Sequence, residues 1–292
     1  MDAVTVERLT KYYGRRVGVE DLNLRVHEGT MFGFLGPNGS GKTTTIRILM
    51  GFLRPSSGAA RVFGLDCWRD GARIKAEVGY LPGDLRLYPW LTCRDAMRTF
   101  ARVRGRDLTR AGAELAEEFG LDPDVRVRAM SRGMRQKLGL VIALAHAPRL
   151  LILDEPTASL DPLMQEKLYC RLREAVAAGG TVLLSSHTLN EVEDLCSRVA
   201  ILRNGRLVAD ESLDRLRSQA RRKVTIRWRS VEDALRGTPP DGVDWTERGA
   251  SQWHGVVRGP MTDLLRWAAE QPIDDFTLES PDLAEIFRGF YV

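Results

Sequence analysis

The sequence predicts an α/β fold with a mostly parallel sheet, an inserted helical subdomain and a small C-terminal α+β domain. Three observations support this prediction. A wholly apolar run leads into a glycine-rich loop and then a segment of helical period, short apolar runs later alternate with helical segments, and a long stretch between them has helical period only. The predicted limits are 1–218 for the main domain, about 88–149 for its helical subdomain and 219–292 for the C-terminal domain.

The N-terminal part predicts strands followed by a loop and a helix. Residues 3–9 alternate between apolar and polar, and residues 22–35 contain two further β-like runs, of which the second, MFGFL, ends at Gly36. Beyond the loop, apolar residues recur at helical spacing from Lys42 until Gly51. The order is therefore strand, glycine-rich loop, helix.

Residues 91–149 are rich in Ala, Leu, Arg and Glu, with breaks at Gly105, 120–123 and Pro148, which indicates a helical insert. After it come the apolar runs LLILDE, TVLLSS and VAILRNG, separated by helical segments at 163–178 and 189–196. This alternation is typical of a parallel sheet wound with helices.

The composition changes at SQARRK, residues 218–223. Beyond it, VTIRW alternates, two more strand-like runs follow, MTDLLRWAAE is helical, and Ser280 and Pro281 suit the N-cap and first turn of a last helix. This domain has no chemical motif. Bracing a dimer, regulating it and shielding the site remain open as its role.

Composition excludes several classes of protein. With 43% apolar and 28% charged residues, the 292-residue chain is expected to be soluble and globular. The longest apolar region, 138–153, is interrupted and shorter than the roughly 20 residues of a membrane span, and the N-terminus lacks a secretory pattern, so we expect a cytoplasmic protein. Four scattered cysteines argue against zinc or disulfides, and a net charge of +4 is too mild to predict nucleic-acid binding.

The segment GPNGSGKTT, residues 36–44, fits the phosphate-loop pattern. Its glycines let backbone N–H groups approach phosphates at the positive end of the following helix. Lys42 is expected to reach the β- and γ-phosphates, and Thr43 to ligate Mg²⁺. The predicted ATP-binding residues here are Gly36, Asn38, Gly39, Ser40, Gly41, Lys42, Thr43 and Thr44.

A phosphate loop also needs a carboxylate for the metal. The run LLILDE ends in Asp154, a predicted Mg²⁺ ligand, and Glu155, a candidate for the base that prepares the attacking water. An apolar run ending in two acids is also common at plain strand ends, so this assignment depends on the phosphate loop.

Five segments in order resemble the ATP-binding cassette (ABC) ATPases, which are phosphate-loop NTPases, over residues 3 to about 215. They are the phosphate loop, MSRGMRQK at 130–137, LLILDEP at 150–156, ASLDP at 158–162 and SSH at 185–187. The resemblance implies an ATP hydrolase that uses ATP and Mg²⁺ and encloses two nucleotides between two copies of the domain.

The resemblance also implies roles for individual residues. Ser131 and Gly133 match the signature motif that meets the γ-phosphate on the opposite subunit, although Arg132 and Met134 depart from its usual glycine and glutamine; a capped surface helix is the structural alternative. Asp161 matches the loop that crosses to the partner, or caps a helix before Pro162.

Two more positions follow from the resemblance. His187 matches the switch histidine that senses the γ-phosphate, while a lone histidine at a strand end is more often structural. Tyr13 matches the aromatic residue that stacks on adenine, with Tyr12 as the competing candidate.

One departure concerns coupling to a membrane partner. In VGYLPGD, Gly83 stands where the family usually has a glutamine that contacts Mg²⁺. Either Asp84 or a water replaces that glutamine, or coupling to the membrane partner is looser. The following LYPWLT, residues 87–92, would line a groove for a partner helix or pack in the core.

Three segments are similar to the corresponding segments of half-size drug and polymer exporter ATPases: GYLP…LYPWLT, GMRQKLGL and SPDLAEIFRGFYV. That similarity implies a homodimer, with a separate transmembrane permease, on the inner face of the cell membrane; it does not name the cargo. Two alternatives are a soluble cassette protein that acts on ribosomes or DNA, and a phosphate-loop kinase, which would leave the signature segment unexplained.

Overall fold

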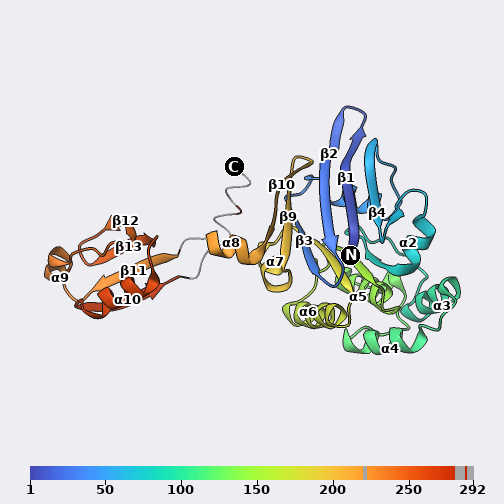
Figure 1. Cartoon of the computed structure of the whole chain (residues 1–292). Coiled ribbons are helices and arrows are strands. Elements are labelled where there is room, and N and C mark those ends of the chain that lie inside the picture. Colours follow the sequence, from blue (N-terminus) through green and yellow to red (C-terminus); the bar gives the residue numbers. More distant parts are fainter. Residues whose placement is uncertain (220–221, 280–286, 288–292) are drawn as a thin grey trace. The chain divides into compact units, whose positions relative to one another are not determined.

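The computed structural model describes residues 1–219, 222–279 and Phe287 (Figure 1). The chain separates into two compact units, Met1–Leu213 and Asp214–Val292, so the division falls shortly before the predicted boundary at residue 218. Each unit has its own apolar core. Every helix in the part of the chain that the structure describes is too short or too polar to span a bilayer.

The first unit is built around a six-stranded sheet. Its strands are β3 (Met31–Leu35), β6 (Val78–Leu81), β7 (Leu150–Asp154), β8 (Thr181–Ser186), β9 (Arg198–Arg203) and β10 (Arg206–Ser212). The order is β10-β9-β3-β8-β7-β6, and only β10 is antiparallel to its neighbour. This agrees with the predicted mostly parallel α/β sheet.

Helices pack against this sheet and bury its central strands. They include α1 (Lys42–Leu49), α2 (Gly71–Glu77), α6 (Pro162–Ala177) and α7 (Leu189–Leu195), and α8 (Leu213–Gln219) follows β10. Every residue of β3, β7 and β8 is buried. Strands buried on both faces form continuous apolar runs, which is why these three are readable from the sequence.

A second, antiparallel sheet contacts α1 through β2 and β4. Its strands are β1 (Asp2–Tyr13), β2 (Arg16–His27), β4 (Ser57–Val62) and β5 (Leu65–Asp66), in the order β2-β1-β4-β5. The sequence predicts β-like runs in this region but not a separate sheet. The pairing of Val4 with Val62 joins segments far apart in the chain, and alternation alone does not identify such a partner.

The helical insert contains α3 (Cys93–Arg104), α4 (Thr109–Glu118), the short 3₁₀ helix η1 (Val127–Ala129) and α5 (Arg132–Leu144). These elements lie within the predicted helical segment. Local chemistry sets the limits of α3: the Thr92 side chain accepts a hydrogen bond from the Asp95 N–H at its start, and Gly105 ends it with φ of 62°.

The second unit has the order strand, helix, strand, strand, helix, strand. Its elements are β11 (Lys223–Trp228), α9 (Val231–Arg236), β12 (Val243–Arg248), β13 (Gln252–Val257), α10 (Met261–Ala269) and β14 (Ile273–Leu278). The antiparallel sheet order β12-β13-β11-β14 is that of a ferredoxin-like fold. The last helix predicted at Ser280 and Pro281 lies outside the described residues.

Candidate functional site

The phosphate loop connects β3 to α1. A Cβ on Gly36 would come within 2.5 Å of the Leu202 carbonyl oxygen, and a Cβ on Gly41 within 2.7 Å of the Gly18 carbonyl oxygen. Gly41 is also the N-cap of α1, with φ of 111°. The loop therefore needs glycine at both positions, and the first turn of α1 carries no acidic residue that would compete with an anion.

Lys42 points its ammonium group back into this loop. Its Nζ donates to the Gly36 carbonyl oxygen at 2.5 Å and lies 3.8 Å from Glu155 Oε1. The side chain is buried, and burial lowers the pKa of Lys42, whereas the charges of Glu155 and Asp154 raise it. The lysine is thus held between the phosphate loop and the carboxyl end of β7.

Asp154 is fixed at the end of β7 by two hydroxyl groups. Thr43 Oγ1 donates to Oδ2 at 2.9 Å, and Ser185 Oγ donates to Oδ1 at 2.6 Å. The Thr43 and Asp154 side chains together offer hard oxygen ligands, and Mg²⁺ is usually bound by one or two such groups along with substrate phosphates and water. These residues therefore fit the predicted metal.

Glu155 adopts a left-handed backbone conformation with φ of 54°, which is uncommon for a residue with a side chain. Gln136 of α5 holds this segment, since its Nε2 donates to the Glu155 and Pro156 carbonyl oxygens at 3.3 and 2.9 Å. His187 Nδ1 lies 2.5 Å from Glu155 Oε2, while Oε1 is buried without a hydrogen-bond partner among the described residues. Of the three residues predicted to be catalytic, Lys42, Glu155 and His187, the last two are therefore in direct contact.

A cavity of about 630 Å³ joins most of the predicted residues. Tyr13 lines it, whereas Tyr12 does not and instead donates its hydroxyl to Glu20 Oε1 at 3.1 Å. The cavity lining also contains Pro37, the predicted residues Asn38, Gly39, Ser40, Gly41, Lys42, Thr43, Thr44, Asp154 and Glu155, and the further residues Arg16, Val17, Gly18, Arg47, Gly83 and Asp84.

Five predicted residues are not part of the lining of this cavity: Gly36, Ser131, Gly133, Asp161 and His187. Ser131 caps α5 by accepting a hydrogen bond from the Met134 N–H at 3.2 Å, and Asp161 caps α6 by accepting one from the Met164 N–H at 2.9 Å. A Cβ on Gly133 would come within 2.8 Å of the Ser159 carbonyl oxygen. Both caps match the structural alternatives for these residues, and caps of this kind do not exclude a contact with a second copy.

Gly83 lies directly against the predicted metal ligand, because a Cβ there would be 3.3 Å from Asp154 Oδ2. Asp84 also lines the cavity, but its carboxylate is largely exposed and pairs with Arg86 at 2.9 Å. After it, Tyr88 and Trp90 form an exposed stacked pair with ring centroids 5.5 Å apart. The aromatic rings of LYPWLT are therefore on the surface rather than in the core.

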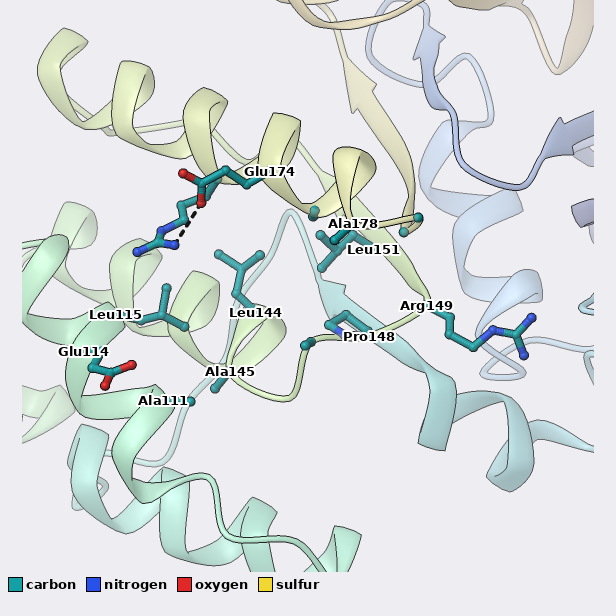
Figure 2. Close-up of a pocket in the computed structure, with 15 residues that line it drawn as sticks. Ala111, Glu114, Leu115, Leu144, Ala145, Pro148, Arg149, Leu151, Glu174 and Ala178 are labelled. Carbon is teal, nitrogen blue, oxygen red and sulfur yellow. Dashed lines mark hydrogen bonds and ion pairs between the residues drawn. The ribbon is translucent and has the colours of Figure 1, made fainter.

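A second cavity, of about 520 Å³, lies among α4, α5 and α6 (Figure 2). Leu115, Leu144 and Leu151 contribute apolar surface to it, and Glu114 and Arg149 contribute charged side chains. No predicted site residue lines it, and it lacks glycines from the phosphate loop. The chemistry predicted from the sequence belongs to the first cavity.

Sequence reasoning missed residues that only the fold brings to the site. Ser185 orients Asp154 and Gln136 holds the segment after β7, and Arg16 and Arg47 line the cavity. Ser185 left a weak signal, because it is a polar residue within the apolar run TVLLSS. The other three lie in or near segments that the sequence singles out, but nothing in their residue type or spacing indicates a contact with the site.

Comparisons with known proteins agree with this geometry. The family model described as "ABC transporter" matches residues 19–158. The chain is 38% identical to the bacitracin transport ATP-binding protein BcrA of Bacillus licheniformis, over 75% of this chain and 72% of that protein. It is 37% identical to the daunorubicin resistance ATP-binding protein DrrA3 of Streptomyces coeruleorubidus, over 98% of this chain and 94% of that protein.

Solved structures give the same fold. An ATP-binding subunit of an ABC transporter superimposes with a TM-score of 0.70 at 33% identity, over 74% of this chain and 92% of that chain. The dimeric cassette MJ0796 superimposes with a TM-score of 0.67 at 23% identity, over 72% of this chain and 98% of that chain. With the phosphate loop and both carboxylates in one cavity, the chain belongs to the ABC transporter family, as an ATP-binding and ATP-hydrolysing subunit.

Proposed function

We propose that this subunit powers a membrane exporter through ATP-dependent closure of a homodimer. The observation that carries the proposal is that one cavity holds the phosphate loop, Asp154 and Glu155, while Ser131 and Asp161 lie outside it. In this proposal each cavity is completed by Ser131, Gly133 and Asp161 of a second copy, so that two ATP molecules lie between two chains.

Within each site, Lys42 and the loop N–H groups bind the β- and γ-phosphates, and Thr43 and Asp154 would hold Mg²⁺. Mg²⁺, when bound, neutralises charge on those phosphates. Glu155 accepts the proton of the attacking water. His187, whose Nδ1 lies 2.5 Å from Glu155 Oε2, orients the Glu155 carboxylate and contacts the γ-phosphate. Loss of the γ-phosphate then removes the group that holds the two copies together.

The partner and cargo are inferred from the relatives. BcrA is named for bacitracin transport, DrrA3 for daunorubicin resistance and another relative for Nod factor export, which favours a drug-like, lipid or polymer cargo. A separate transmembrane permease would choose that cargo, and the subunit would lie on the cytoplasmic face of the membrane.

Glu155→Gln tests the catalytic part of this proposal. The amide keeps the size of the side chain but cannot accept the water proton, so we expect ATP to bind, hydrolysis to fall at least about a hundred-fold and a dimer to accumulate with ATP and Mg²⁺. Sedimentation would detect that dimer, and adding Ser131→Arg should prevent it. A Glu155→Gln variant that stays monomeric and hydrolyses ATP normally would refute the assignment.

Purification of the tagged chain from gently solubilised membranes of its host tests the partner. A multi-spanning permease at comparable stoichiometry supports the exporter. Recovery only with ribosomes or nucleic acid would support the soluble alternative, and the ATPase assignment would stand.

A further inference from the structure

The tip of the β1–β2 hairpin carries an arginine that the proposed mechanism does not use. Tyr13 and Arg16 are paired across the hairpin, with only Gly14 and Arg15 between them. Directly opposite residues of an antiparallel pair project their side chains to the same face. Tyr13 and Arg16 both line the nucleotide cavity, whereas Arg15, in the turn, does not.

The hairpin packs directly on the end of the phosphate loop. A Cβ on Gly18 would lie 2.8 Å from Tyr13 Cε2 and 3.2 Å from Thr44 Cγ2. The Gly18 carbonyl oxygen also lies close to Gly41, since a Cβ there would be 2.7 Å from it. Gly18 therefore separates the aromatic ring from the loop residues that receive the first phosphates of a nucleotide. If the base of a nucleotide stacked on Tyr13, its α-phosphate would have to lie near Gly18, between the Tyr13 ring and the phosphate loop.

The charges that line the cavity leave Arg16 without a partner. Lys42 lies near Glu155, the Asp84 carboxylate pairs with Arg86, and the Asp154 carboxylate accepts from two hydroxyl groups. Within the described residues, the Arg16 side chain makes no hydrogen bond or ion pair. An unpaired guanidinium beside an anion-binding loop is suited to a phosphate, because its planar donors match phosphate oxygens.

The other free arginine of the cavity serves a different region. Arg47 lies on α1. Burial and the Asp154 charge raise the pKa of Tyr80 to about 12, and the charge of Arg47 partly opposes this rise. Arg47 is therefore near Tyr80, on the strand that leads to Gly83. Arg16, on the hairpin with Tyr13, is at the base-binding side.

We propose that Arg16 binds the α-phosphate of the nucleotide, as a second cationic contact separate from Lys42. The inference rests on the proposed nucleotide site. Because ATP and ADP share the α-phosphate, Arg16 strengthens binding of both to the same extent, and this uniform binding lowers KM without changing kcat.

The test compares Arg16→Ala with Arg15→Ala, a neighbouring arginine in the same turn that does not line the cavity. Titration calorimetry of the full chain with ADP and ATP should show Kd raised about five-fold for both nucleotides in Arg16→Ala, as for a charge-assisted contact at an exposed site, and less than about two-fold in Arg15→Ala. KM should rise with kcat unchanged, and Arg16→Lys should recover part of the affinity.

Diastereomers of ADPαS provide a readout that a merely structural role would not change. A contact with one α-oxygen makes the wild-type chain prefer one diastereomer, and Arg16→Ala should reduce that preference. Equal effects of both arginine variants, or an unchanged diastereomer preference, would overturn the inference. If the wild-type chain binds ADP in a way that depends on Lys42, and the Arg16→Ala variant binds ADP with the same affinity as the wild-type chain, only the Arg16 inference fails. If the wild-type chain binds no nucleotide, the proposed function fails.

Discussion

The two units differ in where their polar side chains lie. Polar side chains are buried at the carboxyl edge of the parallel sheet in the first unit, but they are exposed or only partly buried in the sheet of the second unit. In the first unit, Lys42, Asp154, Ser185 and Ser186 are buried at strand ends or beside them. In the second unit, every buried side chain that the structure describes is apolar or aromatic, and the polar residues of its strands are exposed or only partly buried, as in β11 and β14.

The difference shows which unit carries the free-energy cost of buried polar groups. Burying charges and hydroxyl groups costs free energy unless each is paired. Several of the buried polar side chains of the first unit, including Lys42, Asp154 and Ser185, lie around the phosphate loop. The second unit instead packs Trp228, Trp245, Trp253 and Trp267 against one another, with neighbouring ring centroids 4.8 to 6.4 Å apart. Departures from simple packing concentrate at functional sites, so the chemistry is expected in the first unit alone.

The largest expected effect comes from Lys42→Ala. Removing the buried ammonium takes away the contact with the β- and γ-phosphates, so we expect ATP hydrolysis to fall by about a thousand-fold or more, equivalent to about 4 kcal/mol. Phosphate release measures it, with Lys75→Ala as a control at a lysine outside this cavity. Normal turnover in the Lys42 variant would show that the buried polar edge is not the chemical centre.

Trp253→Ala tests the other side of the comparison. Trp253 is 4% exposed and contacts Trp228 and Trp245, so its loss should destabilise the second unit by about 3 to 4 kcal/mol. Calorimetry should show an earlier unfolding transition for that unit while ATP affinity is unchanged. Trp68→Ala, at a half-exposed tryptophan, is the control, and a loss of ATP binding only in the Trp253 variant would mean that the second unit contributes to the site.

The same contrast explains what the sequence could predict. The buried strands of the first unit and the phosphate loop are runs of consecutive residues whose chemistry is local, so β3, β7 and the Asp154–Glu155 pair were readable. The separate antiparallel sheet was not, because β1 pairs with β4 across the phosphate loop and α1. The positions of Gln136 and Arg16 at the site likewise depend on tertiary structure.

In the second unit the missed element is α9. It has only six residues, and its signal is the cap in which Ser230 Oγ accepts from the Asp233 N–H at 3.1 Å. Without α9, the sequence suggests a generic α+β domain. With it, the order of strands and helices is that of the ferredoxin-like fold.

A smaller effect is expected from His146, a buried titratable group of the first unit outside the nucleotide cavity. Burial, with the nearby Arg104 and Arg106, lowers the pKa of His146 to about 4 from an ordinary 6.5. Between about pH 4 and pH 6.5, His146 is therefore protonated in the unfolded chain but not in the folded chain. The free energy of unfolding falls as the pH falls through this range. This contribution amounts to about 2 kcal/mol between pH 7 and 5.

Urea unfolding of His146→Gln measures this contribution. The variant should be less stable at pH 7 but should lose about 2 kcal/mol less than the wild-type chain on going to pH 5. His27→Gln, at an exposed histidine, is the control. An unchanged pH dependence in His146→Gln would mean that burial of this group outside the site has no cost, and the contrast between the units would then rest on the nucleotide site alone.

The smallest effect separates Tyr13 from Tyr12 at the edge of the site, where the polar cavity meets solvent. Tyr13 lines the cavity and Tyr12 is bonded to Glu20, so Tyr13→Ala should raise the Kd for ATP about five-fold, close to 1 kcal/mol, through loss of stacking. Tyr12→Ala should leave it nearly unchanged. GTP should respond as ATP does, because a flat ring stacks on either base; equal losses in both tyrosine variants would instead assign the effect to the hairpin as a whole.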